Sequence, residues 1–221
     1  MHRLSCVRMP ILRALPLWLF RNAGQVCASP SRFYVHETVF AAFAQRFTEL
    51  ADQLKIGDGF APTSQMRPLA NARCLMMVQE LLADAAELGG GTLTGGKRIG
   101  DKGHFFEPTV LVDVPQQARL LNEQPFGPVA PLLRFTDLDS VIAQANSLEY
   151  GLAAFGFTKS LKTATELGNR LQARMVSINH FGLALPETPF GGVRASGHGS
   201  GGGTEGLEAY LTTKLISQIG I

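Results

Sequence analysis

Apolar residues recur along this chain with two different periods, which predict helices and strands in alternation. Over residues 36–54 they recur every three or four positions, as Val39, Phe43 and Phe47 illustrate, and this spacing predicts a helix with one buried face. The same spacing predicts further helices over 71–88, 140–147 and 161–171. Short apolar runs predict strands over 32–35, 92–94, 109–114, 129–135, 151–157 and 175–178. Such alternation is typical of βαβ units, so the pattern predicts an α/β fold with a mainly parallel sheet and flanking helices.

The two ends of the chain carry different signals. Residues 210–217 are β-prone and follow a glycine-rich loop, so we expect a terminal strand whose open edge needs a partner, as in an oligomer. At the other end, Arg3 and Arg8 precede an apolar run that faintly resembles a signal peptide. Arg13 interrupts this run, no small-x-small cleavage site follows, and the run is too short to span a bilayer. We therefore expect no targeting or membrane segment.

Charge and cysteine content narrow the class of protein further. The net charge of the 221 residues is +2, which gives no reason to expect nucleic acid or a membrane surface as a partner. The three cysteines are Cys6, Cys27 and Cys74, an odd number without close spacing. This favours neither a disulfide framework nor a metal site, and it fits a reducing, cytoplasmic compartment.

The segment 20–27, Phe-Arg-Asn-Ala-Gly-Gln-Val-Cys, carries the strongest chemical signal. A thiol attacks as its thiolate, which nearby donors and positive charge make more accessible. Gly24 allows a ligand to approach the backbone closely, and a backbone N–H beside a nucleophile can hold a developing oxyanion. A lone cysteine is by default an inert buried thiol, but this setting favours Cys27 as a nucleophile.

This segment resembles the cysteine signature of the NAD(P)-dependent aldehyde dehydrogenase superfamily. The resemblance continues through residues 103–109, 125–129, Asn179, 189–193 and the pair at 196–197, in the family's order. It implies an aldehyde dehydrogenase catalytic domain over 20–206, an oligomerisation segment over 207–221, and an unrelated leader over 1–19. It also implies a homo-oligomer or an assembly with a full-length homologue.

Family resemblance also implies roles for individual residues. Cys27 would attack an aldehyde to form a thiohemiacetal. Its carbon would then lose a hydride to NAD or NADP to give a thioester, and water would hydrolyse the thioester to release a carboxylate. Phe126 matches the residue beside the nicotinamide ribose, and Gln124 stands where a glutamate usually binds the ribose hydroxyls. Asn179 and Phe190 match positions near the substrate tunnel.

Arg21 is similar to an arginine of some semialdehyde-acid dehydrogenases, where the motif also reads Phe-Arg-Asn. A guanidinium there would suit a substrate with a distal carboxylate, such as succinic semialdehyde. The alternative is that Arg21 pairs with a local acid at the rim of the core, and the sequence favours the two interpretations about equally.

No Gly-x-Gly-x-x-Gly motif after a strand precedes Cys27, since only 26 residues precede it. In the family, the cofactor domain, the oxyanion-hole asparagine and the general-base glutamate all come before the cysteine. The string at 87–90 resembles the family's Glu-Leu-Gly-Gly, but it follows the cysteine, and helix termination explains it better. We therefore expect an N-terminally truncated chain with impaired oxidation. The alternatives are a non-catalytic partner of full-length subunits, or residual thiol chemistry such as ester hydrolysis.

Overall fold

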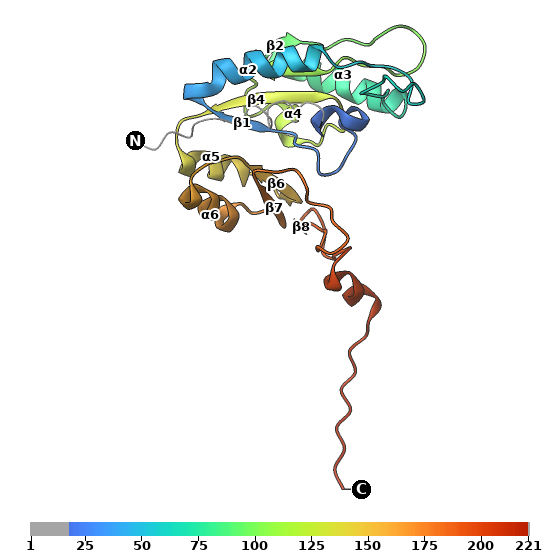
Figure 1. Cartoon of the computed structure of the whole chain (residues 1–221), viewed down its shortest axis with the longest axis vertical. Helices are drawn as coiled ribbons and strands as arrows, with labels where there is room; N and C mark the ends of the chain where they lie inside the picture. The colour runs from blue at the N-terminus through green and yellow to red at the C-terminus, as the bar shows by residue number, and fades with distance from the viewer. Residues whose placement is uncertain (1–17, 221) are drawn as a thin grey trace.

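A four-stranded sheet in the order β1-β4-β3-β2 forms one layer of the computed structural model, which describes residues 18–220 (Figure 1). The strands are β1 (Phe33–His36), β2 (Gly91–Thr94), β3 (Thr109–Val112) and β4 (Val129–Phe135). β4 pairs in parallel with both β1 and β3, and only β2 is antiparallel. The prediction of an α/β fold with a mainly parallel sheet is confirmed. β1 and β2 are the two edges of this sheet.

Helix α2 (Glu37–Asp52) packs against all four strands and buries the face that its periodicity predicted. Phe40 and Phe47 are almost completely buried there. His36 begins this helix, and its side chain accepts a hydrogen bond from the Thr38 amide. Helix α3 (Ala72–Glu87) begins at the cap residue Asn71 and packs against the short helix α4 (Arg119–Asn122). The predicted helices over 36–54 and 71–88 are therefore both present.

A second group of elements follows β4 in the chain and lies on the other side of β1 and β4 from α2 (Figure 1). Helix α5 (Leu138–Ala145) leads to β5 (Tyr150–Gly151) and β6 (Ala153–Gly156). Helix α6 (Leu161–Arg170) then connects β6 to its parallel partner β7 (Met175–Ile178). The predicted strand over 151–157 is divided at Leu152, because β5 pairs with β8 (Val193–Arg194) instead of β7.

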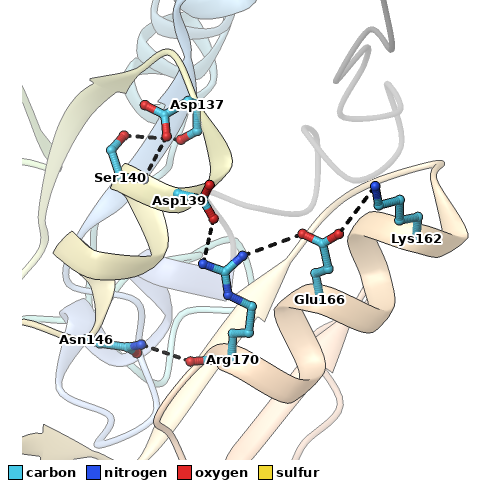
Figure 2. A network of polar contacts seen from close by, with 7 residues as sticks. All are labelled: Asp137, Asp139, Ser140, Asn146, Lys162, Glu166 and Arg170. Atoms are coloured by element: carbon cyan, nitrogen blue, oxygen red, sulfur yellow. Dashed lines mark hydrogen bonds and ion pairs between the residues drawn. The ribbon is translucent and has the colours of Figure 1, made fainter.

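Arg170 on α6 is the centre of a polar network that joins α6 to α5 (Figure 2). Its guanidinium lies 2.6 Å from an oxygen of Asp139 on α5 and 3.6 Å from Glu166 on α6. Asn146 donates to the Arg170 carbonyl and accepts a hydrogen bond from the Gln172 amide, which fixes the end of α6. Exposed ion pairs are individually weak, at about 0–1 kcal/mol, so the network mainly fixes the position of α6 relative to α5.

Replacing Asp137, the N-terminal cap of α5, is expected to destabilise the protein in a pH-dependent way. Hydrogen bonds from the side chain and backbone of Ser140 hold the Asp137 pKa below its ordinary value (Figure 2). A lowered pKa in the folded state gives stabilisation that is present at neutral pH and is lost as pH falls through that folded pKa. The melting temperature of Asp137→Ala should fall below the wild-type value at pH 7, and the gap should close in acid. Asp137→Asn keeps an acceptor, so it should show a smaller difference at pH 7, which should also narrow in acid as the wild-type carboxylate is protonated.

Neither end of the described chain contributes a strand to the sheets. Of the predicted leader, only Trp18 and Leu19 lie in the described range, and Leu19 is buried beside Phe20 in the core. After the 3-10 helix η2 (Thr204–Tyr210), the chain runs extended and exposed away from the other elements (Figure 1). Residues 210–217 form no strand with the described residues, and their role in oligomerisation stays a prediction. No helix in the described range is long and apolar enough to cross a membrane.

Candidate active site

Cys27 lies in a tight turn that follows an unusual left-handed segment. Asn22, Ala23 and Gly24 have φ values of 52°, 53° and 72°. The turn itself is closed by a hydrogen bond of 2.9 Å from the Ser29 amide to the Val26 carbonyl. The Cys27 side chain is exposed.

Gly24 explains why the chain can follow this path. A Cβ atom at Gly24 would lie 2.6 Å from the Gly127 carbonyl carbon and closer still to its oxygen. Together with the positive φ, this close approach requires glycine. The approach brings residues 22–27 against residues 124–127, which the sequence separates by about a hundred positions.

The polar side chains before Cys27 hold the turn in place. The Gln25 side chain donates to the Asn22 carbonyl at 2.9 Å and accepts from the Ala70 amide at 2.8 Å. Asn22 in turn donates to the Gln25 carbonyl at 3.0 Å. The sequence suggested these amides as donors that favour the thiolate, but in the structure both are engaged with the main chain. Their role is to position the cysteine.

The backbone N–H groups of the turn are the donors available beside the thiol. Within residues 18–220, neither the Cys27 amide nor the Ala28 amide donates a hydrogen bond. An amide that has no acceptor and lies next to a nucleophile can stabilise negative charge on a substrate oxygen. This arrangement supports the expectation from the sequence that a backbone N–H beside Cys27 can hold a developing oxyanion.

Cys27 lines a cavity of about 680 Å³ between the four-stranded sheet and the group formed by α5, β6 and α6. Two continuous stretches, 27–36 and 150–158, make up much of its wall. Apolar side chains supply most of the rest, including Val39, Phe43, Leu138, Val141, Ile142, Leu167 and Phe181.

Two titratable residues of the wall are candidates for a general base, and both are engaged elsewhere. The Arg119 guanidinium, 2.7 Å from Glu123, holds the pKa of that carboxyl below its ordinary value, so the carboxylate is a weak base. His36 accepts from the Thr38 amide through Nδ1, and its Nε2 lies 3.1 Å from the Thr136 carbonyl. Neither residue is arranged to activate the water that would hydrolyse a thioester.

Arg21 is connected to the cavity wall through the stacked rings of Trp18 and Phe181. Its guanidinium carbon is 3.9 Å from the centroid of the Trp18 ring, a cation–π geometry. Trp18 stacks on Phe181 with a centroid distance of 5.4 Å, and Phe181 lines the cavity. The sequence did not predict this Trp18–Phe181 stack, although Trp18 is the only tryptophan of the chain.

The two residues assigned to the cofactor, Gln124 and Phe126, lie beside the cysteine turn. The Gln124 side chain donates to the Cys27 carbonyl at 3.3 Å and also lines the cavity. Phe126 has a φ of 40°, is 41% exposed, and shares a small depression with Val26 and Gly24. The structure thus places Gln124 against the Cys27 main chain, and Phe126 beside Gly24 and Val26 of the same segment.

Asn179 and Phe190 do not line the cavity that contains Cys27. The Asn179 side chain accepts from the Thr158 amide and donates to the Thr158 carbonyl, so it ties the end of β7 to the end of β6. Phe190 forms a bridge of two backbone hydrogen bonds with Gly201. Their roles at a substrate tunnel stay predictions. The described residues include no cluster of three metal-ligating side chains.

Comparison with known proteins agrees with the α/β fold. The model of the aldehyde dehydrogenase family matches residues 12–216, and the chain belongs to that family. It is 45% identical over 197 residues to a probable NADP-dependent succinate-semialdehyde dehydrogenase of Sinorhizobium fredii. It is 42% identical, also over 197 residues, to the NADP-dependent succinate-semialdehyde dehydrogenase of Escherichia coli.

Solved structures give the same result for the fold. The succinate-semialdehyde dehydrogenase of Burkholderia pseudomallei superposes with a TM-score of 0.88 at 36% identity, over 90% of this chain and 42% of that one. The matches to the two curated relatives cover 89% of this chain but only 40% and 41% of theirs. The chain therefore spans about two fifths of the length of these relatives.

Proposed function

We propose that Cys27 is the nucleophile in the oxidation of an aldehyde to a carboxylate, with NADP or NAD as hydride acceptor. The observation that carries this proposal is an exposed thiol on a turn whose own amide has no acceptor among residues 18–220. Membership of the aldehyde dehydrogenase family supplies the reaction class. NADP is the first candidate because both curated relatives carry it in their names.

The chemistry begins when the Cys27 thiolate attacks the aldehyde carbon. The C–S bond forms as the carbonyl π electrons move to oxygen, and the Cys27 N–H stabilises that oxygen. A bound nicotinamide would supply the hydride acceptor, so that loss of hydride from this carbon would leave a thioester on Cys27. Water then adds to the thioester, the C–S bond breaks, and the carboxylate leaves as the thiol is regenerated.

Two residues of this chain fit a nicotinamide ribose beside Cys27. The Gln124 amide nitrogen is bound to the Cys27 carbonyl, which leaves its side-chain oxygen to accept from a ribose hydroxyl. The half-exposed Phe126 ring offers an apolar surface next to it. A glutamine gives a neutral hydrogen bond here, which is weaker than that of a carboxylate.

A polypeptide of only these 221 residues is expected to oxidise aldehydes poorly or not at all. Glu123 and His36 are poorly placed to serve as a base, and no Gly-x-Gly-x-x-Gly motif precedes Cys27. Purified chain with NADP and succinic semialdehyde should therefore give little NADPH. A chimera in which residues 20–219 replace the matching region of the E. coli relative should produce NADPH. A folded chimera that binds NADP without turnover would contradict the proposal.

Arg21 is proposed to recognise the distal carboxylate of a semialdehyde acid, as the names of the relatives suggest. Bonds to charged groups contribute about 1.5–3 kcal/mol, so Arg21→Met in the chimera should raise KM for succinic semialdehyde roughly 10- to 150-fold. The KM for butyraldehyde, which lacks the carboxylate, should change little. An equal effect on both substrates would show that Arg21 acts through its contact with Trp18.

A second candidate function is non-catalytic assembly with full-length subunits or with other copies of this chain. It rests on the exposed terminal segment, in which Leu215 and Ile219 are at least 90% exposed. Deletion of residues 207–221 should abolish co-purification with a full-length homologue, and retention after the deletion would argue against this function. A cytoplasmic location stays a prediction from the cysteine content.

A further inference from the structure

Gly127 is held between helix α3 and the segment that contains Cys27. A Cβ atom on Gly127 would overlap a methyl group of Val78, which is fully buried on α3. On its other side, Gly127 meets Gly24, where an added Cβ would overlap the Gly127 carbonyl. Two buried leucines anchor the short helix α4, which precedes this region in the chain. Residues 122–124 lie between these two anchors and are exposed, so their position depends on side-chain contacts.

Asp84 of α3 supplies a cap that α4 lacks in its own sequence. The cap residue of α4, Ala118, makes no side-chain hydrogen bond to the helix. Instead, the Asp84 carboxylate accepts a hydrogen bond of 2.8 Å from the Arg119 amide. The Arg119 guanidinium also lies 3.9 Å from Glu80, which is one turn before Asp84 on the same face of α3. Helix α3 therefore fixes the first residue of α4 through its main chain and through its side chain.

The Arg119 guanidinium binds the residue that follows α4 as well. It donates to both carboxylate oxygens of Glu123, at 2.7 and 3.1 Å. A two-point bond of this kind fixes the relative orientation of the two groups, which a single ammonium charge does not. Glu123 is followed directly by Gln124, whose side chain donates to the Cys27 carbonyl at 3.3 Å. Arg119 thus holds the neighbour of the residue that contacts the cysteine.

The hydrogen bond from Gln124 fixes more than the Cys27 carbonyl. The peptide that joins Cys27 to Ala28 is planar, so a donor that holds its carbonyl also sets the direction of the Ala28 N–H. That N–H is one of the two amides of the turn that donate no hydrogen bond within residues 18–220. A displaced Gln124 would therefore displace a donor that can face a developing oxyanion.

We propose that Arg119 and Asp84 are positioning residues for the Cys27 turn and act through Gln124. Asp84 fixes the start of α4, Arg119 fixes Glu123 at its end, and Gln124 transmits this position to the Cys27–Ala28 peptide. Neither Arg119 nor Asp84 lines the cavity, so neither acts by contact with a substrate there. This role deepens the proposed function and rests on it, since it concerns the donors beside the nucleophile.

The test follows acetylation of Cys27 and Cys74 by p-nitrophenyl acetate in the full chain carrying Cys6→Ser. Arg119→Met should slow acetylation of Cys27 roughly fivefold and leave Cys74 unchanged. In a Gln124→Ala background, which should itself be slow, Arg119→Met should slow Cys27 no further, because both substitutions remove the same contact. Equal slowing in the two backgrounds, or no slowing in either, would overturn the proposal.

Conservative variants distinguish positioning from a general loss of stability. Asp84→Asn keeps an acceptor for the Arg119 amide, so it should acetylate Cys27 at nearly the wild-type rate, whereas Asp84→Ala should be as slow as Arg119→Met. Arg119→Lys keeps the charge without the two-point bond and should give an intermediate rate. Exposed ion pairs contribute little to stability, so the melting temperature of Arg119→Met should stay within about 4 °C of the wild-type value. Equal rates in the two Asp84 variants would contradict the role of the cap.

Arg46 offers a matched control for loss of an ion pair. Its guanidinium lies 2.7 Å from Glu49 on α2, and this pair is about as exposed as the pair of Arg119 and Glu123. Neither Arg46 nor Glu49 lines the cavity, so Arg46→Met should not change the rate at Cys27. A similar slowing in Arg46→Met and Arg119→Met would show that any surface ion pair has this effect and would overturn the proposal.

Hydrogen exchange provides a second measurement that needs no reactive thiol. Arg119→Met should speed exchange of the amides over residues 22–29 several-fold, while Arg46→Met should not. Wild-type Cys27 that is acetylated no faster than Cys74 would count against the proposed function. Unchanged exchange over 22–29 in Arg119→Met would instead overturn the positioning role, so the two failures can be told apart.

Discussion

The variant Gly24→Ala is expected to lose about 3 kcal/mol or more of its free energy of unfolding, a large loss for a single methyl group. The added Cβ would overlap the Gly127 carbonyl, and the φ of 72° is unfavourable for alanine. Because both segments are main chain, relief of the overlap requires the cysteine turn to move away from residues 124–127. Urea unfolding measures the loss, and thiol labelling of Cys27 measures the change at the turn.

Gly100→Ala is the matched control for this prediction. Gly100 has a φ of 64°, but a Cβ there would meet nothing within 4 Å. It should therefore lose only about 1 kcal/mol, which is the backbone contribution alone. If both variants lose the same amount, the contact between Gly24 and Gly127 does not hold the turn.

Replacing the proposed nucleophile should have the largest effect on catalysis. In the chimera with the E. coli relative, Cys27→Ser should lower kcat for succinic semialdehyde by about a thousandfold or more. The affinity for NADP should be unchanged, since the Gln124 and Phe126 side chains remain in place. Loss of NADP binding along with activity would indicate a folding defect.

Cys74→Ser is the control for loss of a thiol in general. Cys74 lies on α3, is partly buried against the core, and does not line the cavity. Its replacement should leave kcat within about twofold of the unsubstituted chimera, as expected for a residue remote from the reaction. Equal losses from the two substitutions would remove the special role of Cys27.

Elements that depend on local sequence were the ones that could be predicted. The spacing of Phe40, Phe43 and Phe47 predicted α2, and the apolar run of β4 predicted its strand over the same residues. β8 has only two residues, and its pairing with β5 is set by contacts far apart in the chain. The terminal segment 210–217 has strand-like residues but no partner among the described ones, and a strand requires a partner.

The candidate site shows the same difference between local features, which the sequence predicts, and contacts between distant segments, which it does not. The motif over 20–27 was sufficient to propose Cys27. It assigned the close approach at Gly24 to a ligand, whereas the structure has the Gly127 main chain there. It could not predict that Gln25 binds the Ala70 amide, because that contact joins segments 45 residues apart. Nor could it predict that Trp18 and Phe181 stack between Arg21 and the cavity. For Asn179, the family resemblance implied a position near the substrate tunnel. In the structure its side chain is hydrogen-bonded to Thr158 instead.

Acyl transfer is the most direct test of the proposal that Cys27 is a nucleophile held beside a backbone N–H without an acceptor among residues 18–220. A Cys6→Ser variant of the chain is treated with p-nitrophenyl acetate, and acetylation of each cysteine is followed by peptide mass spectrometry. We expect Cys27 to be acetylated at least tenfold faster than Cys74, and faster in the folded chain than in urea. Equal rates at the two cysteines, or faster acetylation of Cys27 after unfolding, would contradict the account.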